Sequence, residues 1–216
     1  MTKPAAIDRA VLELPGDSHA RPHANCYWLI PGRLLAGEHP GVVPGASVNA
    51  TVDALLDAGV REFIDLTEEH EPPPLYAAAL RERAGARGIA ARHRRFAIPD
   101  CGVPSDALMR TILDAIHNAL ETENAVYVHC YAGVGRTGTV VGCFLREHGL
   151  SSADALAVLA FKWQSEEKRS RHPRSPEWPG QFACIEGWRN AEDGGKAAGT
   201  PVLGCVGDAP SRERAR

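Results

Sequence analysis

Residues 125–139 read AVYVHCYAGVGRTGT, and this stretch predicts the centre of the fold. Ala125 to His129 is a short run of β-branched and aromatic residues, which is typical of a buried strand. The glycines that follow predict a tight turn. Apolar residues then recur at helical spacing from Arg136 to about His148, so this segment should lay one face of a helix on the sheet. A buried strand, a tight turn and a helix in this order predict an α/β fold.

The turn from Cys130 to Arg136 is suited to binding a tetrahedral oxyanion. Gly133 and Gly135 permit positive φ angles, so that several backbone N–H groups can point inward. Such a ring of donors, closed by the positive end of a helix dipole, binds anions. The ring and the Arg136 guanidinium also favour thiolate over thiol at Cys130, which would make it a nucleophile at neutral pH.

The segment HCYAGVGRTGT resembles the signature loop of the cysteine-dependent protein tyrosine and dual-specificity phosphatases. That loop reads HCxxGxxR followed by Ser or Thr, and five residues match it in register: His129, Cys130, Gly133, Arg136 and Thr137. An inert buried thiol is the alternative for Cys130, but an accidental match of the whole pattern between a strand and a helix is improbable. The resemblance implies a phosphatase-like α/β fold whose central, mostly parallel sheet is flanked by helices on both faces.

The resemblance also implies a mechanism of two displacements at phosphorus. Cys130 attacks the phosphate and a cysteinyl-phosphate forms. Water then hydrolyses it, while the Thr137 hydroxyl donates a hydrogen bond to the departing thiolate. Backbone N–H groups and Arg136 bind the phosphate, so no metal or other cofactor is expected. The predicted substrate-binding residues form the loop: Tyr131, Ala132, Gly133, Val134, Gly135 and Arg136.

The segment IPDCGVP, residues 98–104, is the second candidate for chemistry. The departing oxygen of a phosphate ester needs a proton at neutral pH, and a loop carboxylic acid is the usual donor. The segment is similar to the acid loop of the dual-specificity phosphatases, which implies Asp100 as the general acid; a residue that only caps a turn is the alternative. Because Cys130 must be deprotonated while Asp100 is protonated, we expect a bell-shaped pH profile that peaks on the mildly acidic side.

Three further residues have roles that the sequence leaves open. Cys101, next to Asp100, would trap an oxidised Cys130 as a disulfide only if its thiol points that way. Strand alternation should turn His129 away from phosphate, so that it hydrogen-bonds the loop from behind; a plain core histidine is the alternative. Gln181 lies in the region where enzymes of the resembling family carry a glutamine that orients the hydrolytic water.

Three polar segments are interpreted as connections or solvated faces. Thr67 to Glu71 is predicted to be a solvated connection, and the alternative is that it overhangs the site. The basic run Arg92 to Arg95, on a predicted edge strand, favours a solvated face over a phosphate site. Lys162 to Pro176 is charged and broken by prolines, which predicts an exposed connection, and Ser175 is the predicted start of the next helix.

Length, charge and cysteine spacing indicate the class of protein. A chain of 216 residues fits one domain, which we place at residues 25–190, between an N-terminal arm (1–24) and a flexible tail (191–216). The net charge of −3 argues against a nucleic-acid partner. No stretch is typical of a membrane span or a secretory signal, so we expect no membrane partner and a cytoplasmic location. The six cysteines show no paired spacing, which favours free thiols.

The predicted function is a protein phosphatase for phosphotyrosine, with phosphoserine and phosphothreonine left open. A phosphoinositide or inositol phosphate phosphatase is the first alternative. Such enzymes tend to place lysines inside the loop, whereas the residues between Cys130 and Arg136 carry no charge, which favours a singly phosphorylated substrate. A silent phosphate-binding module is the second alternative, but the joint presence of Cys130, Arg136 and Asp100 favours turnover. The expected partner is a phosphorylated protein or peptide, and the sequence predicts no oligomeric state.

Overall fold

The computed structural model describes residues 19–71 and 76–189. The predicted tail, 191–216, and residues 1–18 of the predicted arm lie outside the described residues.

A five-stranded sheet forms the centre of the fold, in the order β1-β2-β5-β3-β4. β1 (Cys26–Ile30) pairs antiparallel with β2 (Leu34–Gly37), and the other neighbouring strands pair in parallel. β5 (Ala125–His129) lies between β2 and β3 (Val60–Asp65), and β4 (Arg92–Arg95) lies at the edge. The mostly parallel sheet, the buried strand at 125–129 and the basic edge strand are therefore confirmed.

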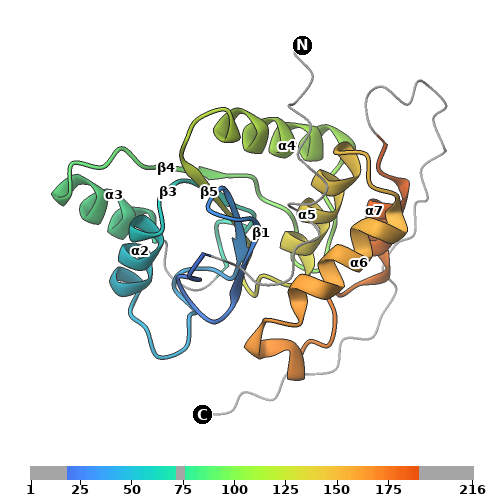
Figure 1. Cartoon of the computed structure of the whole chain (residues 1–216), viewed down its shortest axis with the longest axis horizontal. Helices are drawn as coiled ribbons and strands as arrows, with labels where there is room; N and C mark the ends of the chain where they lie inside the picture. The colour runs from blue at the N-terminus through green and yellow to red at the C-terminus, as the bar shows by residue number, and fades with distance from the viewer. Residues whose placement is uncertain (1–18, 72–75, 190–216) are drawn as a thin grey trace.

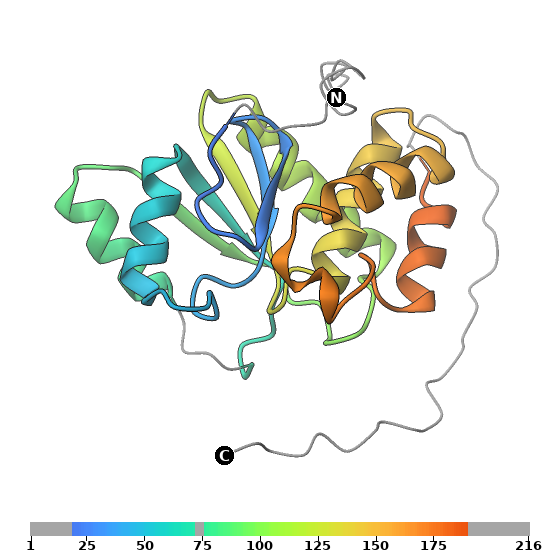
Figure 2. The ribbon, with the colours of Figure 1, turned by 60° about the horizontal axis from the view of Figure 1, so that its bottom comes forward.

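Helices cover both faces of the sheet, as predicted (Figures 1 and 2). α2 (Val48–Asp57) and α3 (Ala77–Ala86) pack on one face. The opposite face carries four helices: α4 (Asp106–Leu120), α5 (Gly135–Glu147), α6 (Ser152–Trp163) and α7 (Pro179–Gly187). The short 3-10 helix η1 (Glu167–Ser170) lies between α6 and α7 in the chain. No helix within residues 19–71 and 76–189 has the length and apolar content to cross a membrane.

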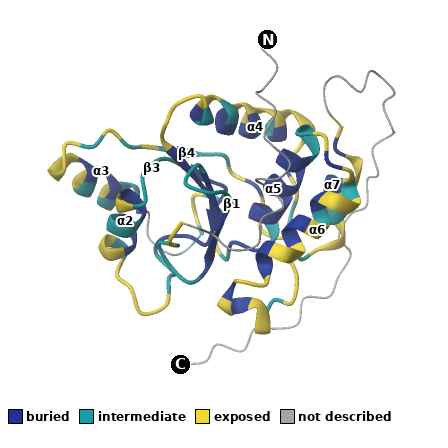
Figure 3. Ribbon diagram, viewed as in Figure 1, coloured by how far each residue is buried: buried dark blue, intermediate teal, exposed yellow. Residues whose placement is uncertain are grey.

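Strand alternation divides the core between the two faces. Phe63 and Tyr127 pack with α2 and α3, whereas their neighbours Ile64 and Val128 pack with the helices of the opposite face. All four side chains are fully buried. Figure 3 shows buried residues along the central strands and exposed residues on the outer sides of the helices. Burial on both faces explains why β5 is a continuous apolar run rather than an alternating one.

Serine caps determine where two helices begin. The Ser105 hydroxyl accepts a hydrogen bond from Leu108 N (3.2 Å) at the start of α4, and the Ser151 hydroxyl accepts one from Asp154 N (3.1 Å) at the start of α6. Both caps satisfy backbone donors that the first turn of a helix leaves unpaired. The cap on α4 also ends the candidate acid loop, because Ser105 follows Pro104 directly.

The segment after α6 differs from the prediction. Lys162 to Pro176 was predicted to be an exposed connection, but Lys168 and Ser175 in it are buried. The predicted helix start at Ser175 is also wrong, since α7 begins at Pro179. The physical reason is that these polar groups find partners in the turn after β5. The Ser175 hydroxyl, for example, donates a hydrogen bond to Val134 O (2.7 Å).

The basic strand β4 is paired with acidic residues of β3. Arg94 lies 3.3 Å from the Glu62 carboxylate, and Arg95 lies 3.1 Å from the Asp65 carboxylate. Arg92 is exposed. The prediction of a solvated face therefore holds for Arg92, whereas Arg94 and Arg95 are half-buried and ion-paired with carboxylates of β3.

Candidate active site

The turn after β5 brings Cys130 to the edge where the parallel strands end, which is where α/β sheets bind ligands. Gly133 has a φ of 73°, as predicted, and a Cβ there would lie 2.5 Å from the carbonyl carbon of Gly37. Gly135 does not adopt a positive φ, so that part of the prediction is wrong. Its missing side chain instead leaves room for the Gln181 amide, whose Nε2 would lie 2.7 Å from a Cβ at this position.

Four carbonyl groups of this loop accept hydrogen bonds from groups outside it. The pairs are His129 Nδ1 to Cys130 O (3.2 Å), His39 N to Tyr131 O (3.0 Å), Lys168 Nζ to Ala132 O (2.5 Å) and Ser175 Oγ to Val134 O (2.7 Å). Across a trans peptide, the C=O of one residue and the N–H of the next point in opposite directions. The N–H groups of residues 131, 132, 133 and 135 therefore point away from these donors, which is the arrangement that an oxyanion ring needs.

Arg136 is nearly fully buried, and its guanidinium joins three segments. It forms a bidentate ion pair with Glu71, with Nη1–Oε1 at 2.5 Å and Nη2–Oε2 at 2.8 Å. Nη1 also donates to Ile98 O (3.1 Å). Burial lowers the pKa of Arg136, but the hydrogen bond to Glu71 and the nearby acidic groups raise it by a larger amount. The net pKa is therefore raised, and the guanidinium stays charged. The prediction that Thr67 to Glu71 is only a solvated connection is thus wrong for Glu71.

Asp100 lies beside this guanidinium. Its Oδ1 is 3.2 Å from Arg136 Nη2, and its side chain is 60% exposed. The Asp100 backbone N–H donates to the Glu68 carboxylate (3.2 Å), and Glu68 N in turn donates to Glu71 (2.8 Å). The segment that carries the two glutamates therefore positions both the predicted acid and the predicted phosphate-binding arginine.

A family model described as PTP-SAK, Swiss Army Knife protein, DSP-PTPase phosphatase domain, matches residues 23–176. This span contains the loop after β5, the acid loop and the segment that carries Glu71. The chain belongs to this family. It is thereby a member of the cysteine-dependent protein tyrosine and dual-specificity phosphatase superfamily, which its signature loop resembled.

Individual relatives of this phosphatase-domain chain share about a third of its residues or fewer over the matched segments. It is 33% identical over 138 residues to the dual specificity protein phosphatase CDC14AB of Danio rerio, which covers 60% of the chain and 20% of the relative. It is 28% identical over 116 residues to an Arabidopsis thaliana protein named phosphatidylinositol 3,4,5-trisphosphate 3-phosphatase and protein-tyrosine-phosphatase PTEN1, covering 53% of the chain and 27% of the relative. The crystal structure of Tk-PTP in the active form has the same fold, with a TM-score of 0.55 at 22% identity over 71% of this chain and 89% of that one. The chain thus spans about a fifth to a quarter of the length of these curated relatives.

Thr137 and His129 flank the phosphatase-domain loop in the sequence. The Thr137 hydroxyl is fully buried and has no hydrogen-bond partner among the described residues. His129 lies behind the loop, as predicted, where it contacts Cys130 O and hydrogen-bonds to the Tyr76 hydroxyl (2.7 Å). Burial lowers the pKa of His129 to about 3, so the ring is neutral and donates one proton to the loop carbonyl.

Gln181, at the start of α7, connects that helix to the acid loop. Its Nε2 donates to Gly102 O (3.2 Å), and its Oε1 accepts from Trp178 N (3.1 Å). Cys101, between Asp100 and Gly102, is exposed and free, with a φ of 61°. Burial, with the Asp100 charge as the next cause, raises the pKa of the Cys101 thiol, which disfavours the thiolate at neutral pH.

Sequence reasoning missed the residues that support the phosphatase-domain loop from outside. Glu71 and Lys168 lie in charged, proline-rich segments, and Ser175 was assigned to a helix. Each acts through a partner far away in the chain, so no local pattern marks it. Among the described residues, no group of three or more His, Cys, Asp or Glu could hold a metal ion.

Proposed function

We propose that this chain is a protein phosphatase that hydrolyses phosphotyrosine, and also phosphoserine or phosphothreonine, monoesters through a cysteinyl-phosphate intermediate. The observation that carries the proposal is the arrangement around Cys130. Its loop turns four carbonyls outward, and Asp100 lies 3.2 Å from the Arg136 guanidinium. We place the catalytic domain at residues 25–190.

In the first step, the loop N–H groups and Arg136 bind the phosphoryl oxygens and stabilise the charge that develops on them. The Cys130 thiolate attacks phosphorus, the bond to the ester oxygen breaks, and Asp100 transfers its proton to that oxygen. The products are an alcohol or phenol, a cysteinyl-phosphate and an ionised Asp100.

In the second step, water hydrolyses the intermediate. Asp100 takes a proton from the water, the new P–O bond forms and the S–P bond breaks, which returns the Cys130 thiolate. The Thr137 hydroxyl is buried and has no partner within residues 19–71 and 76–189, which supports a role as hydrogen-bond donor to that leaving thiolate. Gln181 lies between the acid loop and Gly135, which supports a role in orienting the water.

The charge around the loop favours a singly phosphorylated substrate. Arg136 is the only charged residue between Cys130 and Thr137, and the nearby charged groups at Glu68, Glu71 and Asp100 are carboxylates. A head group with several phosphates would meet these carboxylates at close range and be repelled. A phosphoinositide phosphatase remains the second candidate because of the similarity to the Arabidopsis PTEN1 protein.

Phosphate release from a phosphotyrosyl peptide, a phosphoseryl peptide and a triply phosphorylated inositol lipid tests the proposal. We expect the phosphotyrosyl peptide to have the highest kcat/KM and Cys130→Ser to lose at least about a thousandfold in rate. A higher kcat/KM for the lipid would favour the second candidate. Binding of phosphopeptide without any phosphate release would favour the silent module instead.

The role of Asp100 has its own test. Asp100→Asn should lower kcat about a hundredfold or more with phenyl phosphate, but much less with p-nitrophenyl phosphate, because the nitrophenolate needs little protonation to leave. Asp106→Asn, an exposed aspartate at the start of α4, is the matched control and should leave both rates unchanged. Equal losses with both leaving groups would contradict the general-acid role.

We also propose a cytoplasmic location. All five cysteines of the described residues are free, and a reducing compartment keeps thiols in that state, which a cysteine nucleophile needs. The proposed partner is a phosphorylated protein or peptide.

A further inference from the structure

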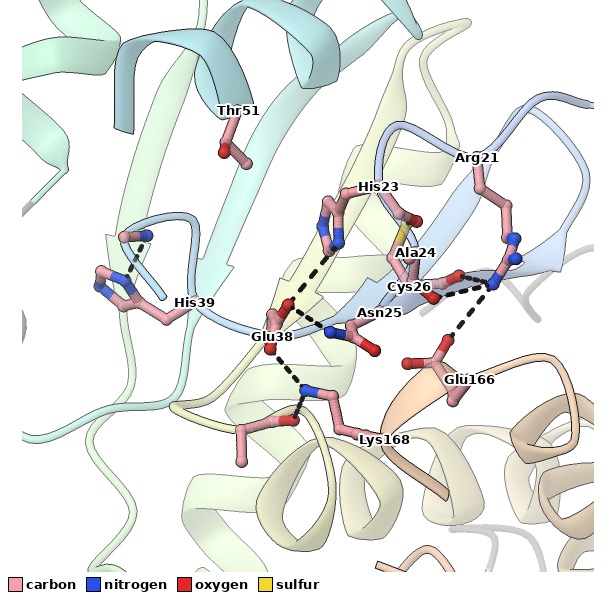
Figure 4. A network of polar contacts seen from close by, with 12 residues as sticks. Arg21, His23, Ala24, Asn25, Cys26, Glu38, His39, Thr51, Glu166 and Lys168 are labelled. Carbon is pink, nitrogen blue, oxygen red and sulfur yellow. Dashed lines mark hydrogen bonds and ion pairs between the residues drawn. The ribbon is translucent and has the colours of Figure 1, made fainter. Parts of the chain in front are cut away.

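A buried ammonium group lies directly behind the phosphate loop. Lys168, in η1, is only 6% exposed. Its Nζ lies 2.6 Å from Glu38 Oε2 and 2.5 Å from Ala132 O, as Figure 4 shows by dashed lines from the ammonium to Glu38 and to a backbone carbonyl. Lysine is rarely buried without a specific partner, because removing its charge from water is costly. The contact of the ammonium with a loop carbonyl therefore needs an explanation beyond surface solvation.

Glu38 holds the lysine in place as a fixed counter-ion. Its other carboxylate oxygen accepts a hydrogen bond from Asn25 Nδ2 (2.9 Å) and lies 4.0 Å from His23 Nδ1 (Figure 4). Its backbone carbonyl accepts a hydrogen bond from the Tyr127 hydroxyl (2.5 Å). Because Glu38 follows the end of β2 and Tyr127 lies in the neighbouring strand β5, the counter-ion is anchored to the centre of the sheet.

The position of the ammonium determines the orientation of one peptide group. Ala132 O and Gly133 N belong to the same peptide, so a donor on the carbonyl turns the N–H to the opposite side, toward the oxyanion ring. A cation on the carbonyl also polarises the peptide, which strengthens its N–H as a donor. Among the four donors to loop carbonyls, Lys168 is the one with a formal charge, since His129 is neutral, Ser175 uses a hydroxyl and His39 uses its backbone N–H.

We propose that Lys168, with Glu38 as its counter-ion, is a positioning residue of the phosphate loop. It fixes the peptide between Ala132 and Gly133 so that the N–H faces the bound oxyanion. The inference rests on the proposed function in taking a phosphate-like oxyanion as the ligand of the loop.

The alternative is that the buried ion pair only stabilises the fold. Three variants of the full chain separate the two: Lys168→Met, Glu38→Gln, and the double variant that carries both changes. Each single change leaves one buried polar partner uncompensated and should lower the melting temperature. The double variant removes both charges and should recover most of that loss, although the Ala132 carbonyl still lacks its donor.

The probe is tungstate, a tetrahedral oxyanion that binds without turnover. We expect Lys168→Met and the double variant to bind tungstate about tenfold more weakly by calorimetry, because a charged hydrogen bond is lost. Arg169→Met, an exposed neighbour in η1, is the matched control and should leave the tungstate affinity unchanged.

A double variant that recovers tungstate affinity together with stability would overturn the inference, as would a wild-type chain that does not bind tungstate. If Lys168→Met alone is too unstable to purify, the double variant still gives the decisive comparison. A wild-type chain that binds tungstate but releases no phosphate from any ester would overturn the proposed function and leave the role of Lys168 intact.

Discussion

Thr137 carries a buried hydroxyl that folding alone does not explain. Its hydroxyl is fully buried without a partner among the described residues, which costs about 1 kcal/mol or more. We therefore predict that Thr137→Val raises the free energy of unfolding by about 1 kcal/mol, because valine has the same shape and no polar group. The same change should lower kcat about tenfold and produce a burst of product in rapid-mixing kinetics, because hydrolysis of the intermediate becomes slow.

Thr139 is the matched control for this prediction. It is buried in the same helix, but its hydroxyl donates to Gly135 O (2.8 Å). Thr139→Val should therefore lower the free energy of unfolding by up to about 1 kcal/mol and show no burst. If Thr137→Val destabilises the chain as Thr139→Val does and leaves kcat unchanged, its hydroxyl serves the fold and the leaving-group role is excluded.

The residues that could be predicted are those that lie close together in sequence. Cys130, Arg136 and Thr137 belong to one contiguous pattern, and Asp100 lies in a short proline-bounded loop. Glu71 could not be predicted, because its only signal is its contact with Arg136 across the fold. A charged residue in a polar segment is usually solvated, so the sequence rule failed where a buried charge had a distant partner.

Among the secondary-structure elements, the close packing of α5 on α7 places Gln181 at the loop. A Cβ at Gly142 would lie 2.3 Å from Ile185 Cδ1, so a residue with a side chain at position 142 would not allow the two helices to approach this closely. We predict that Gly142→Ala lowers the free energy of unfolding by about 1 to 3 kcal/mol through overpacking. It should also lower kcat, because the displaced α7 carries Gln181 away from Gly102.

Gly85 in α3 provides the control for this substitution. A Cβ there would meet nothing within 4 Å, so Gly85→Ala should raise the free energy of unfolding by about 0.5 to 1 kcal/mol through helix propensity alone. Urea denaturation of both variants measures the difference. Stabilisation by Gly142→Ala would show that α7 can shift without cost.

Elements with an amphipathic pattern could be predicted, and the segment without one could not. The sequences of α4 and α6 each carry a serine cap and apolar residues at helical spacing, and both signals act within one helix. The chain between α6 and α7 carries its information in long-range polar contacts, such as those of Lys168 and Ser175 with the phosphate loop. Periodicity does not detect such contacts, so the exposed connection and the early helix start were wrong.

In the molecule as a whole, neutral histidines that are buried or half-buried connect stability to pH. Burial is the largest cause that lowers the pKa of four of them, to about 3 for His129 and to about 4 for His23, His39 and His117. In the unfolded chain a histidine has a pKa near about 6.5. Between these values the unfolded state binds more protons at these histidines than the folded state does. Their contribution to stability is therefore complete above pH 6.5 and is lost as the pH decreases toward 4.

We therefore predict a steep loss of stability on the acidic side of neutrality. Each such histidine contributes up to about 1.4 kcal/mol per pH unit between its two pKa values. Urea denaturation at pH 7.5, 6.5, 5.5 and 4.5 measures the slope, and a free energy of unfolding that stays constant from pH 7.5 to 4.5 would contradict the prediction. His39→Asn should reduce the slope by the contribution of one histidine. Asparagine does not titrate, and it can still accept the hydrogen bond that Gly41 N donates to His39 Nδ1 (2.9 Å).

Loss of activity at acidic pH then has two causes, titration of the active site and unfolding. A return to neutral pH distinguishes them, because titration reverses at once, whereas an unfolded chain recovers activity only at the rate of refolding.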